Sequence, residues 1–174
     1  MVRLLLAMCL FPVTVFANPT VQTLLAQGDF FAPITVMQEL ESKNDRGTIC
    51  GFGMDVADKQ LVYRLSMIDL STGKILRFQY LAADGSLLQQ SDELLTNQGV
   101  EQVNAVKMLQ GKNIHFSDLV AMARKNHQGQ LLQAELDHDL SISYLELKLL
   151  NQNSKSIVAF DIKNLRPLPL LKWD

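Results

Sequence analysis

The sequence predicts an α+β protein made of two tandem units, each of which packs a helix on an antiparallel β-sheet. Two observations lead to this prediction. Hydrophobic residues first recur with helical spacing and then alternate with polar residues, as in a helix followed by half-buried strands. The same succession returns 82 residues further along the chain. We therefore divide the chain into residues 1–17, 18–95 and 96–174.

Residues 1–17 have the pattern of a secretory signal peptide. Arg3 supplies the positive start, an apolar stretch follows, and Ala17 ends a cleavage site, so that the mature chain begins at Asn18. The alternative is an uncleaved anchor, which the shortness of the apolar stretch disfavours because a spanning helix needs about 20 residues. Cys9 does not suit lipid attachment, since Met8 rather than a small residue precedes it. We expect a periplasmic or secreted protein that is not stably inserted in a membrane after cleavage.

The first unit begins with a short helical stretch over residues 21–27 and a second helix that starts at Pro33, a residue suited to the first helical turn. Strands follow, with inward faces that begin at Cys50, Tyr63 and Leu76. Their turns contain the Asp and Gly residues that hairpins need, over residues 69–74 and 83–86. We expect Gly47 to be a left-handed residue just beyond the helix.

The second unit repeats this order when residues 33–88 are placed on 115–170 without gaps. Identical pairs include Gly47 with Gly129, Leu65 with Leu147 and Phe78 with Phe160. A helical stretch over residues 100–110 precedes the unit, as residues 21–27 precede the first. Leu40 falls on Met122, and the alignment places both in the core, together with Met37, Met54 and Met67. Joined edge to edge, the two sheets would form one longer sheet with a broad surface for a partner.

The first unit resembles the PepSY domain family. The resemblance rests on a Tyr-containing strand, an Asp-x-x-x-Gly hairpin and a closing Asp-Gly turn, in residues 62–69, 73–78 and 84–88. It covers residues 20–90 well and 106–170 more weakly, because the second unit has no glycine in its hairpin and has residues 164–167 in place of the Asp-Gly turn. The resemblance implies a protein that restrains or regulates other proteins, peptidases among them, and it carries over no catalytic residues.

No residue pattern indicates a metal, cofactor or catalytic site. The three histidines, His115, His127 and His138, form no metal-binding motif. Asp137-His138-Asp139 is the most site-like cluster, and a loose metal or pH-sensing group is one interpretation. The other is a polar hairpin between strands, which we favour because adjacent strand residues point to opposite faces.

The remaining candidates are more typical of structural roles. Cys50 could be a redox thiol or nucleophile, but its match with Leu132 favours a buried structural cysteine. Glu39, Glu41 and Asp118 could be acid or base groups, although single carboxylates are more often surface or helix-dipole charges. The run Gly51-Phe52-Gly53 lies in a strand without the context of a phosphate loop, and favours a bulge or a close backbone approach.

The expected function is that of a non-enzymatic regulatory protein. Sixteen Lys and Arg against eighteen Asp and Glu give a net charge of −2, which disfavours nucleic acid as a partner. We expect contact with a peptidase or an extracytoplasmic sensor domain, through strand addition to an exposed sheet edge. The alternative is a small-ligand or ion-binding protein with a pocket between sheet and helices. Oligomeric state and the unit that makes the contact stay open.

Overall fold

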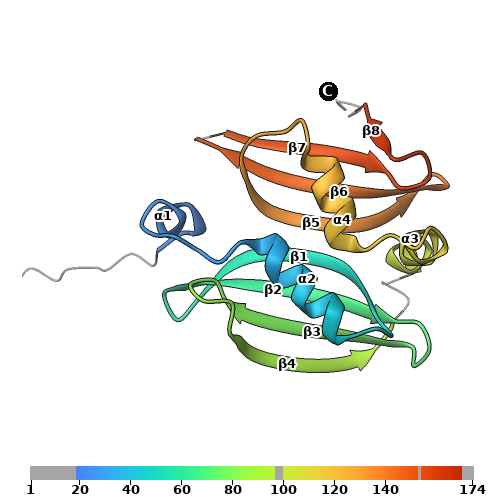
Figure 1. The fold of residues 1–174 in the computed structure, drawn as a ribbon, viewed down its shortest axis with the longest axis horizontal. Coiled ribbons are helices and arrows are strands. Elements are labelled where there is room, and N and C mark those ends of the chain that lie inside the picture. Colours follow the sequence, from blue (N-terminus) through green and yellow to red (C-terminus); the bar gives the residue numbers. More distant parts are fainter. Residues whose placement is uncertain (1–18, 97–99, 153, 170–174) are drawn as a thin grey trace, which may run out of the picture.

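The computed structural model describes residues 19–96, 100–152 and 154–169. The described chain forms one antiparallel sheet of eight strands in the order β4-β3-β2-β1-β5-β6-β7-β8 (Figure 1). The expected signal peptide, residues 1–17, lies outside the described residues. The α+β prediction is confirmed, and the two expected sheets join edge to edge through β1 and β5.

Within the described residues, each half of the chain contributes two helices and four strands. The first half consists of α1 (Val21–Leu25), α2 (Pro33–Lys43), β1 (Thr48–Ala57), β2 (Gln60–Asp69), β3 (Lys74–Leu81) and β4 (Leu87–Leu94). The second half consists of α3 (Val100–Gly111), α4 (Phe116–Arg124), β5 (Gln130–Asp139), β6 (Ile142–Asn151), β7 (Ser154–Asp161) and β8 (Arg166–Leu168).

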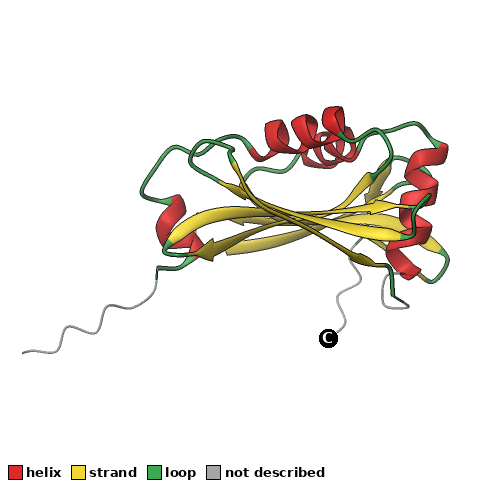
Figure 2. Cartoon of the chain, turned by 90° about the horizontal axis from the view of Figure 1, so that it is seen from below, coloured by secondary structure: helices red, strands yellow, loops and turns green. Residues whose placement is uncertain are grey.

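The helices cover one face of the sheet and its two ends. Figure 2 shows α2 and α4 side by side on the same face, and no helix of the described chain lies over the middle of the opposite face. α1 and α3 lie at opposite ends of the central strands (Figure 1), where α1 contacts β1 and β2 while α3 contacts β5, β6 and β1. Below, we call the face without α2 and α4 the open face.

The core lies between the sheet and the helices α2 and α4. Its largest fully buried side chains include Tyr63, Phe116, Met37 and Leu119. The rings of Phe52 and Tyr63 are 5.5 Å apart between centroids and tilted by 52°, a favourable geometry for an aromatic pair. Tyr63 also donates its hydroxyl to the Phe31 carbonyl at 2.7 Å, which satisfies the polar end of a buried side chain.

A local two-fold axis relates the two halves. β1 and β5 pair through Gly51 with Glu135, Phe52 with Ala134, and Gly53 with Gln133. In the 82-residue repeat, Gly51 and Gly53 correspond to Gln133 and Glu135, so the repeat turns the first pair into the third. Phe52 corresponds to its own partner, Ala134, so the middle pair is unchanged. The axis therefore passes between Phe52 and Ala134, where a large side chain opposes a small one.

The repeat is confirmed in the first two strands of each half. β1 and β5, like β2 and β6, start 82 residues apart. The register of β1 with β2 shifts at Cys50, and the register of β5 with β6 shifts at Leu132, 82 residues later. A bulge at the same place in both halves is a conserved irregularity of the repeat rather than a feature of one hairpin.

The gap-free alignment is wrong in the third strand. Asp69 pairs with Lys74 across the first hairpin, whereas Asn151 pairs with Ser154 across the second, which is two residues shorter. Val158, not Phe160, is therefore the counterpart of Phe78. Because two residues is one full period of a strand, the change preserves the buried face, and both Val158 and Phe160 are buried.

The placement of Met122 in the core is also wrong, because the two helices present different faces to the sheet. α2 buries Val36, Met37 and Leu40, whereas α4 buries Phe116, Ser117, Leu119, Val120 and Ala123. Met122, the counterpart of Leu40, is 37% exposed. Met37 and Met67 are fully buried as predicted, and Met54 is partly buried.

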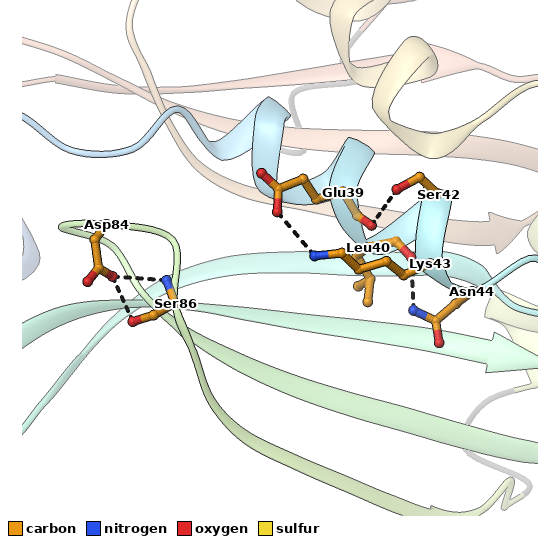
Figure 3. Close-up of polar contacts among 7 residues, drawn as sticks. All are labelled: Glu39, Leu40, Ser42, Lys43, Asn44, Asp84 and Ser86. Atoms are coloured by element: carbon orange, nitrogen blue, oxygen red, sulfur yellow. Dashed lines mark hydrogen bonds and ion pairs between the residues drawn. The ribbon is translucent and has the colours of Figure 1, made fainter.

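Gly47 is not the left-handed residue that the sequence predicts. α2 ends at Lys43, and Asn44 closes it by donating its side-chain amide to the Leu40 carbonyl at 2.9 Å (Figure 3). Gly47 is required instead because a Cβ there would collide with the Met67 side chain. Gly129 does have a positive φ of 119°.

The two helices on the sheet are joined by a carboxylate. Glu41 of α2 accepts hydrogen bonds from the Ser117 hydroxyl at 2.6 Å and the Ser117 main-chain N–H at 3.2 Å, in the first turn of α4. The residue before α4, His115, makes no side-chain capping bond of its own. Glu41 therefore caps α4 from the neighbouring helix, where a negative charge also suits the helix dipole.

We predict that Phe52→Ala destabilises the protein by about 3–5 kcal/mol, because it removes a buried ring beside the local axis and leaves a cavity. Equilibrium urea unfolding of the chain from Asn18 measures this. Leu140→Ala is the control, since Leu140 is 82% exposed and its loss should cost no more than about 0.5 kcal/mol. Equal losses for the two variants would contradict the central place given to Phe52.

We predict that Glu41→Ala destabilises the protein by about 1–2 kcal/mol, because it leaves the buried Ser117 hydroxyl and an N-terminal N–H of α4 without their partner. Glu39→Ala is the matched control. Glu39 lies two residues away and makes an exposed ion pair with Lys43 at 3.4 Å (Figure 3), worth at most about 0.5 kcal/mol. A smaller effect at position 41 than at position 39 would rule out the cap.

Candidate functional site

The three histidines do not come together. His115 precedes α4, His127 follows it, and His138 lies near the end of β5. Within the described residues, no group of three or more His, Cys, Asp and Glu side chains is arranged to hold a metal ion.

Asp137, His138 and Asp139 are the last residues of β5 rather than the hairpin that we favoured. The hairpin itself is Leu140-Ser141, both with positive φ. The side chains have separate partners: Asp137 accepts a bond from the Tyr144 hydroxyl at 2.8 Å, while His138 Nδ1 lies 2.8 Å from the Ser143 hydroxyl. The expected divergence of neighbouring strand residues is confirmed, so the cluster does not converge on one point.

Cys50 is fully buried, as the repeat predicts. It lies at the bulge of β1, and its Sγ is 3.5 Å from the Ser66 carbonyl. Burial raises the pKa of the thiol to about 12, so the nucleophilic thiolate is essentially absent near neutral pH.

The single carboxylates have local roles. Glu39 pairs with Lys43, Glu41 caps α4, and Asp118 lies in the first turn of α4, where its charge suits the helix dipole. The helix-dipole interpretation thus fits Glu41 and Asp118, although for Glu41 the dipole belongs to the neighbouring helix.

The open face of the sheet is polar, and two glycines of β1 lie on it. Gly51 and Gly53 carry no side chain there, and the bulge expected near them is present. A shallow hollow of about 250 Å³ lies beside them, over β2, β3 and β4. It is lined by Arg64, Leu65, Ser66, Arg77, Phe78, Gln79, Gln89 and Ser91.

The charges around this hollow are already paired. Arg64 contacts Asp55 at 2.8 Å, and the Arg77 guanidinium donates to Glu93, with an Nε–Oε1 distance of 3.0 Å. The hollow therefore offers hydroxyl and amide groups more than net charge. Such a surface suits hydrogen bonding to another polypeptide, and it assembles no nucleophile with a base.

A second hollow of about 270 Å³ lies at the junction of the two halves, between the loop after α1 and the start of β5. Its lining includes Asp29, Phe30, Met54, Arg124 and Gln130. Arg124 donates to the Gly129 carbonyl at 2.8 Å, which fixes the turn that enters β5. The volumes of both hollows fall below the approximately 300–1,000 Å³ of usual small-molecule sites.

The two edges of the sheet differ. β8 is three residues long and contains Arg166 and Pro167, which are features that protect an edge from further pairing. β4 is eight residues long, contains neither Pro nor Lys, and exposes every one of its side chains. Leu87, Leu88 and Leu94 are 49%, 51% and 70% exposed. Sequence reasoning expected an exposed edge but named only three strands in each unit, so it missed both β4 and β8.

β4 is held firmly on its inner side. Asp84 Oδ1 accepts bonds from the Ser86 N–H at 2.9 Å and the Ser86 hydroxyl at 2.7 Å, just before the strand begins (Figure 3). These bonds from Ser86 lower the pKa of Asp84. Lys74 of β3 contacts Asp92 of β4 at 2.6 Å. The edge is thus a defined strand whose two carboxylates are neutralised from within the sheet.

The main-chain groups that β4 presents outward follow from its register. Leu95 donates its N–H to the Gly73 carbonyl at 2.9 Å, and Lys74 pairs with Leu94 next to them. Hydrogen-bonded and non-hydrogen-bonded pairs alternate along an antiparallel ladder. Gln90, Asp92 and Leu94 therefore direct their N–H and C=O groups away from β3, toward the open edge.

Comparison with known proteins gives a structural likeness but no family. No family model matches the chain, and no curated protein matches it significantly. A solved structure of a "putative lipoprotein" from Clostridium difficile 630 is similar, with a TM-score of 0.47 and 17% sequence identity, over 83% of this chain and 95% of that one. In the described part of the chain, no helix has the length and apolarity to cross a membrane.

We predict that the Cys50 thiol of the chain from Asn18 stays unreactive toward a disulfide reagent such as dithionitrobenzoate while the protein is folded. Because its pKa is raised to about 12, the rate should stay flat between about pH 7 and about pH 9, where an ordinary thiol ionises. Unfolding in guanidinium should release the reaction. Fast labelling of the folded protein that rises with pH would restore Cys50 as a functional thiol.

Proposed function

We propose that this protein is a non-enzymatic, extracytoplasmic regulatory protein that binds a protein partner by accepting an extended segment of it along β4. The observation that carries the proposal is the outer edge of β4, with its row of outward N–H and C=O groups and eight exposed side chains. Strand addition uses such an edge, because main-chain hydrogen bonds give affinity and alternate side chains give specificity.

The surroundings of β4 suit this mode of binding. Gln89 and Ser91 belong to the strand and also line the hollow on the open face, so side chains of an added strand would reach polar groups there. Leu88 and Leu94 offer exposed apolar area to the same segment. The paired state of Asp92 and Glu93 leaves no net charge that would repel it.

The sequence supports a protein partner outside the cytoplasm. The resemblance of residues 20–90 to the PepSY domain and the signal-like residues 1–17 support a partner outside the cytoplasm. We propose a peptidase that is restrained by the contact or the extracytoplasmic domain of an envelope sensor that is modulated by it. The small-ligand alternative has less support, because the hollows of about 250 and 270 Å³ are small and shallow.

We predict that a photoreactive benzoylphenylalanine in place of Gln90 captures a peptidase or sensor domain in the intact envelope. The matched control carries the same group in place of Leu140, which is exposed at a hairpin of the other half. Wild-type protein without the photoreactive group should compete for the partner and reduce capture. Unlabelled Gln90→Ala protein should compete equally well, whereas unlabelled Gln90→Pro protein should not reduce capture.

Binding at β4 would be contradicted if the photoreactive residue captured the same partner from position 140 as from position 90. It would also be contradicted if the Gln90→Pro variant reduced capture. Recovery of no peptidase and no sensor domain at position 90 would contradict the regulatory function. Both variants are first checked by circular dichroism, so that loss of the fold is not mistaken for loss of the edge.

A further inference from the structure

The edge that β4 presents is complementary to itself. An antiparallel partner strand must pair its own outward groups with those of Gln90, Asp92 and Leu94. Two copies of β4 related by a two-fold axis at Ser91 satisfy this condition. In that register Gln90 opposes Asp92 of the second copy, and each residue directs its N–H and C=O toward the other.

The side chains also match in the regular part of the strand. Leu94 comes opposite Leu88 of the second copy, at the point where β4 shifts register against β3, and these are the two most exposed leucines of the strand. On the open face Gln89 opposes Glu93 of the second copy, so an amide donor faces a carboxylate. Cross-strand pairs of this kind are favourable, whereas like charges directly opposed are not.

The neighbouring registers are worse. Moving the axis to Asp92 would place that carboxylate directly against its own copy. Moving it to Gln90 would place Asp92 against Leu88 and Glu93 against Leu87 of the second copy. Registers with the axis between two residues fail. They pair a residue whose N–H and C=O point to the open edge with one whose N–H and C=O point to β3.

We infer that, when no other partner is bound, β4 of a second copy occupies this edge and joins two molecules in a two-fold dimer with a continuous sheet. The inference rests on the proposed function in taking β4 as a strand-accepting edge, and it adds a regulation: a partner must displace the second copy to bind. The assembly closes at two copies because the opposite edge, β8, is short and carries Pro167.

The molecule already contains an assembly of this type. β1 and β5 join two homologous halves edge to edge, antiparallel and about a local two-fold axis. In Figure 1, β4 forms the outer edge of the first half, and none of the helices drawn there lies beyond it among the described residues. A second junction of the same type is therefore compatible with the way these four-stranded units pack.

Sedimentation velocity of the chain from Asn18 over a range of concentrations tests the dimer. The expected result is a dimer whose fraction rises with concentration. Gln90→Pro should give a monomer, because it removes an outward N–H and leaves the bonds to β3 in place. Gln90→Ala, which keeps the main chain intact, should dimerise like the wild type.

A crosslinking experiment tests the register without relying on proline. Ser91→Cys places a thiol on the axis opposite its own copy, so mild oxidation should give a disulfide-linked dimer. Gln89→Cys is the matched control, since its thiol faces Glu93 and should stay monomeric. The double variant with Gln89→Cys and Glu93→Cys should crosslink again.

The outcomes separate the two proposals. A monomer at all concentrations, or a dimer that Ser91→Cys does not link and Gln90→Pro does not break, overturns the inference. If position 90 still captures a peptidase or sensor domain in that case, the proposed function stands alone. A dimer linked through Ser91→Cys with no such capture supports the inference and overturns the regulatory partner.

Discussion

The junction of β1 with β5 is the constraint on which the rest of the structure depends. It consists of only the pairs centred on Phe52 and Ala134, yet it makes one sheet out of two four-stranded units. So short a ladder holds because Phe52 is buried beside Tyr63 on the helix side, while Gly51 and Gly53 leave the other side open. The core thus covers the junction on one face, and the opposite face is a polar surface with a hollow over β2, β3 and β4.

The helix layer reinforces the junction from above. α2 and α4 belong to different halves, contact each other and both contact β1, and the Glu41 carboxylate binds the first turn of α4. The repeat does not supply this bond twice, because the counterpart of Glu41 is the buried Ala123. At this position of the repeat, the second half has an apolar alanine, whereas the first half has a glutamate that hydrogen-bonds to the neighbouring helix. The two helices consequently present different faces to the sheet, which explains the exposure of Met122.

Local patterns predicted most of the fold, whereas contacts between distant segments did not follow from them. The turns after Asp69 and Asp84 are encoded within a few residues, and Gly73 and Gly85 have the positive φ that such turns require. The shift of β7 was missed because apolar alternation is unchanged by two residues. The cap on Ser117 and the inward turn of Leu40 depend on how helices from separate halves pack. For the candidate site, the buried Cys50 was predictable from its match with Leu132. β4 was not predicted, because all of its residues are exposed and it lacks the alternation of apolar and polar residues that marks a half-buried strand.

Duplication itself explains why the two edges matter. Joining two equal units consumes one edge of each and leaves the other two, β4 and β8, as symmetry-related ends of the sheet. Equal ends would let the molecules add head to tail without limit or aggregate. In this chain the two ends differ. β8 has three residues and contains Arg166 and Pro167, whereas β4 has eight exposed residues, a register shift at Leu88, and two carboxylates paired with Lys74 and Arg77. A sheet in which β8 resists pairing and β4 accepts it can bind one added strand without continuing to polymerise. That property is consistent with the proposed contact, in which a partner adds one strand to β4.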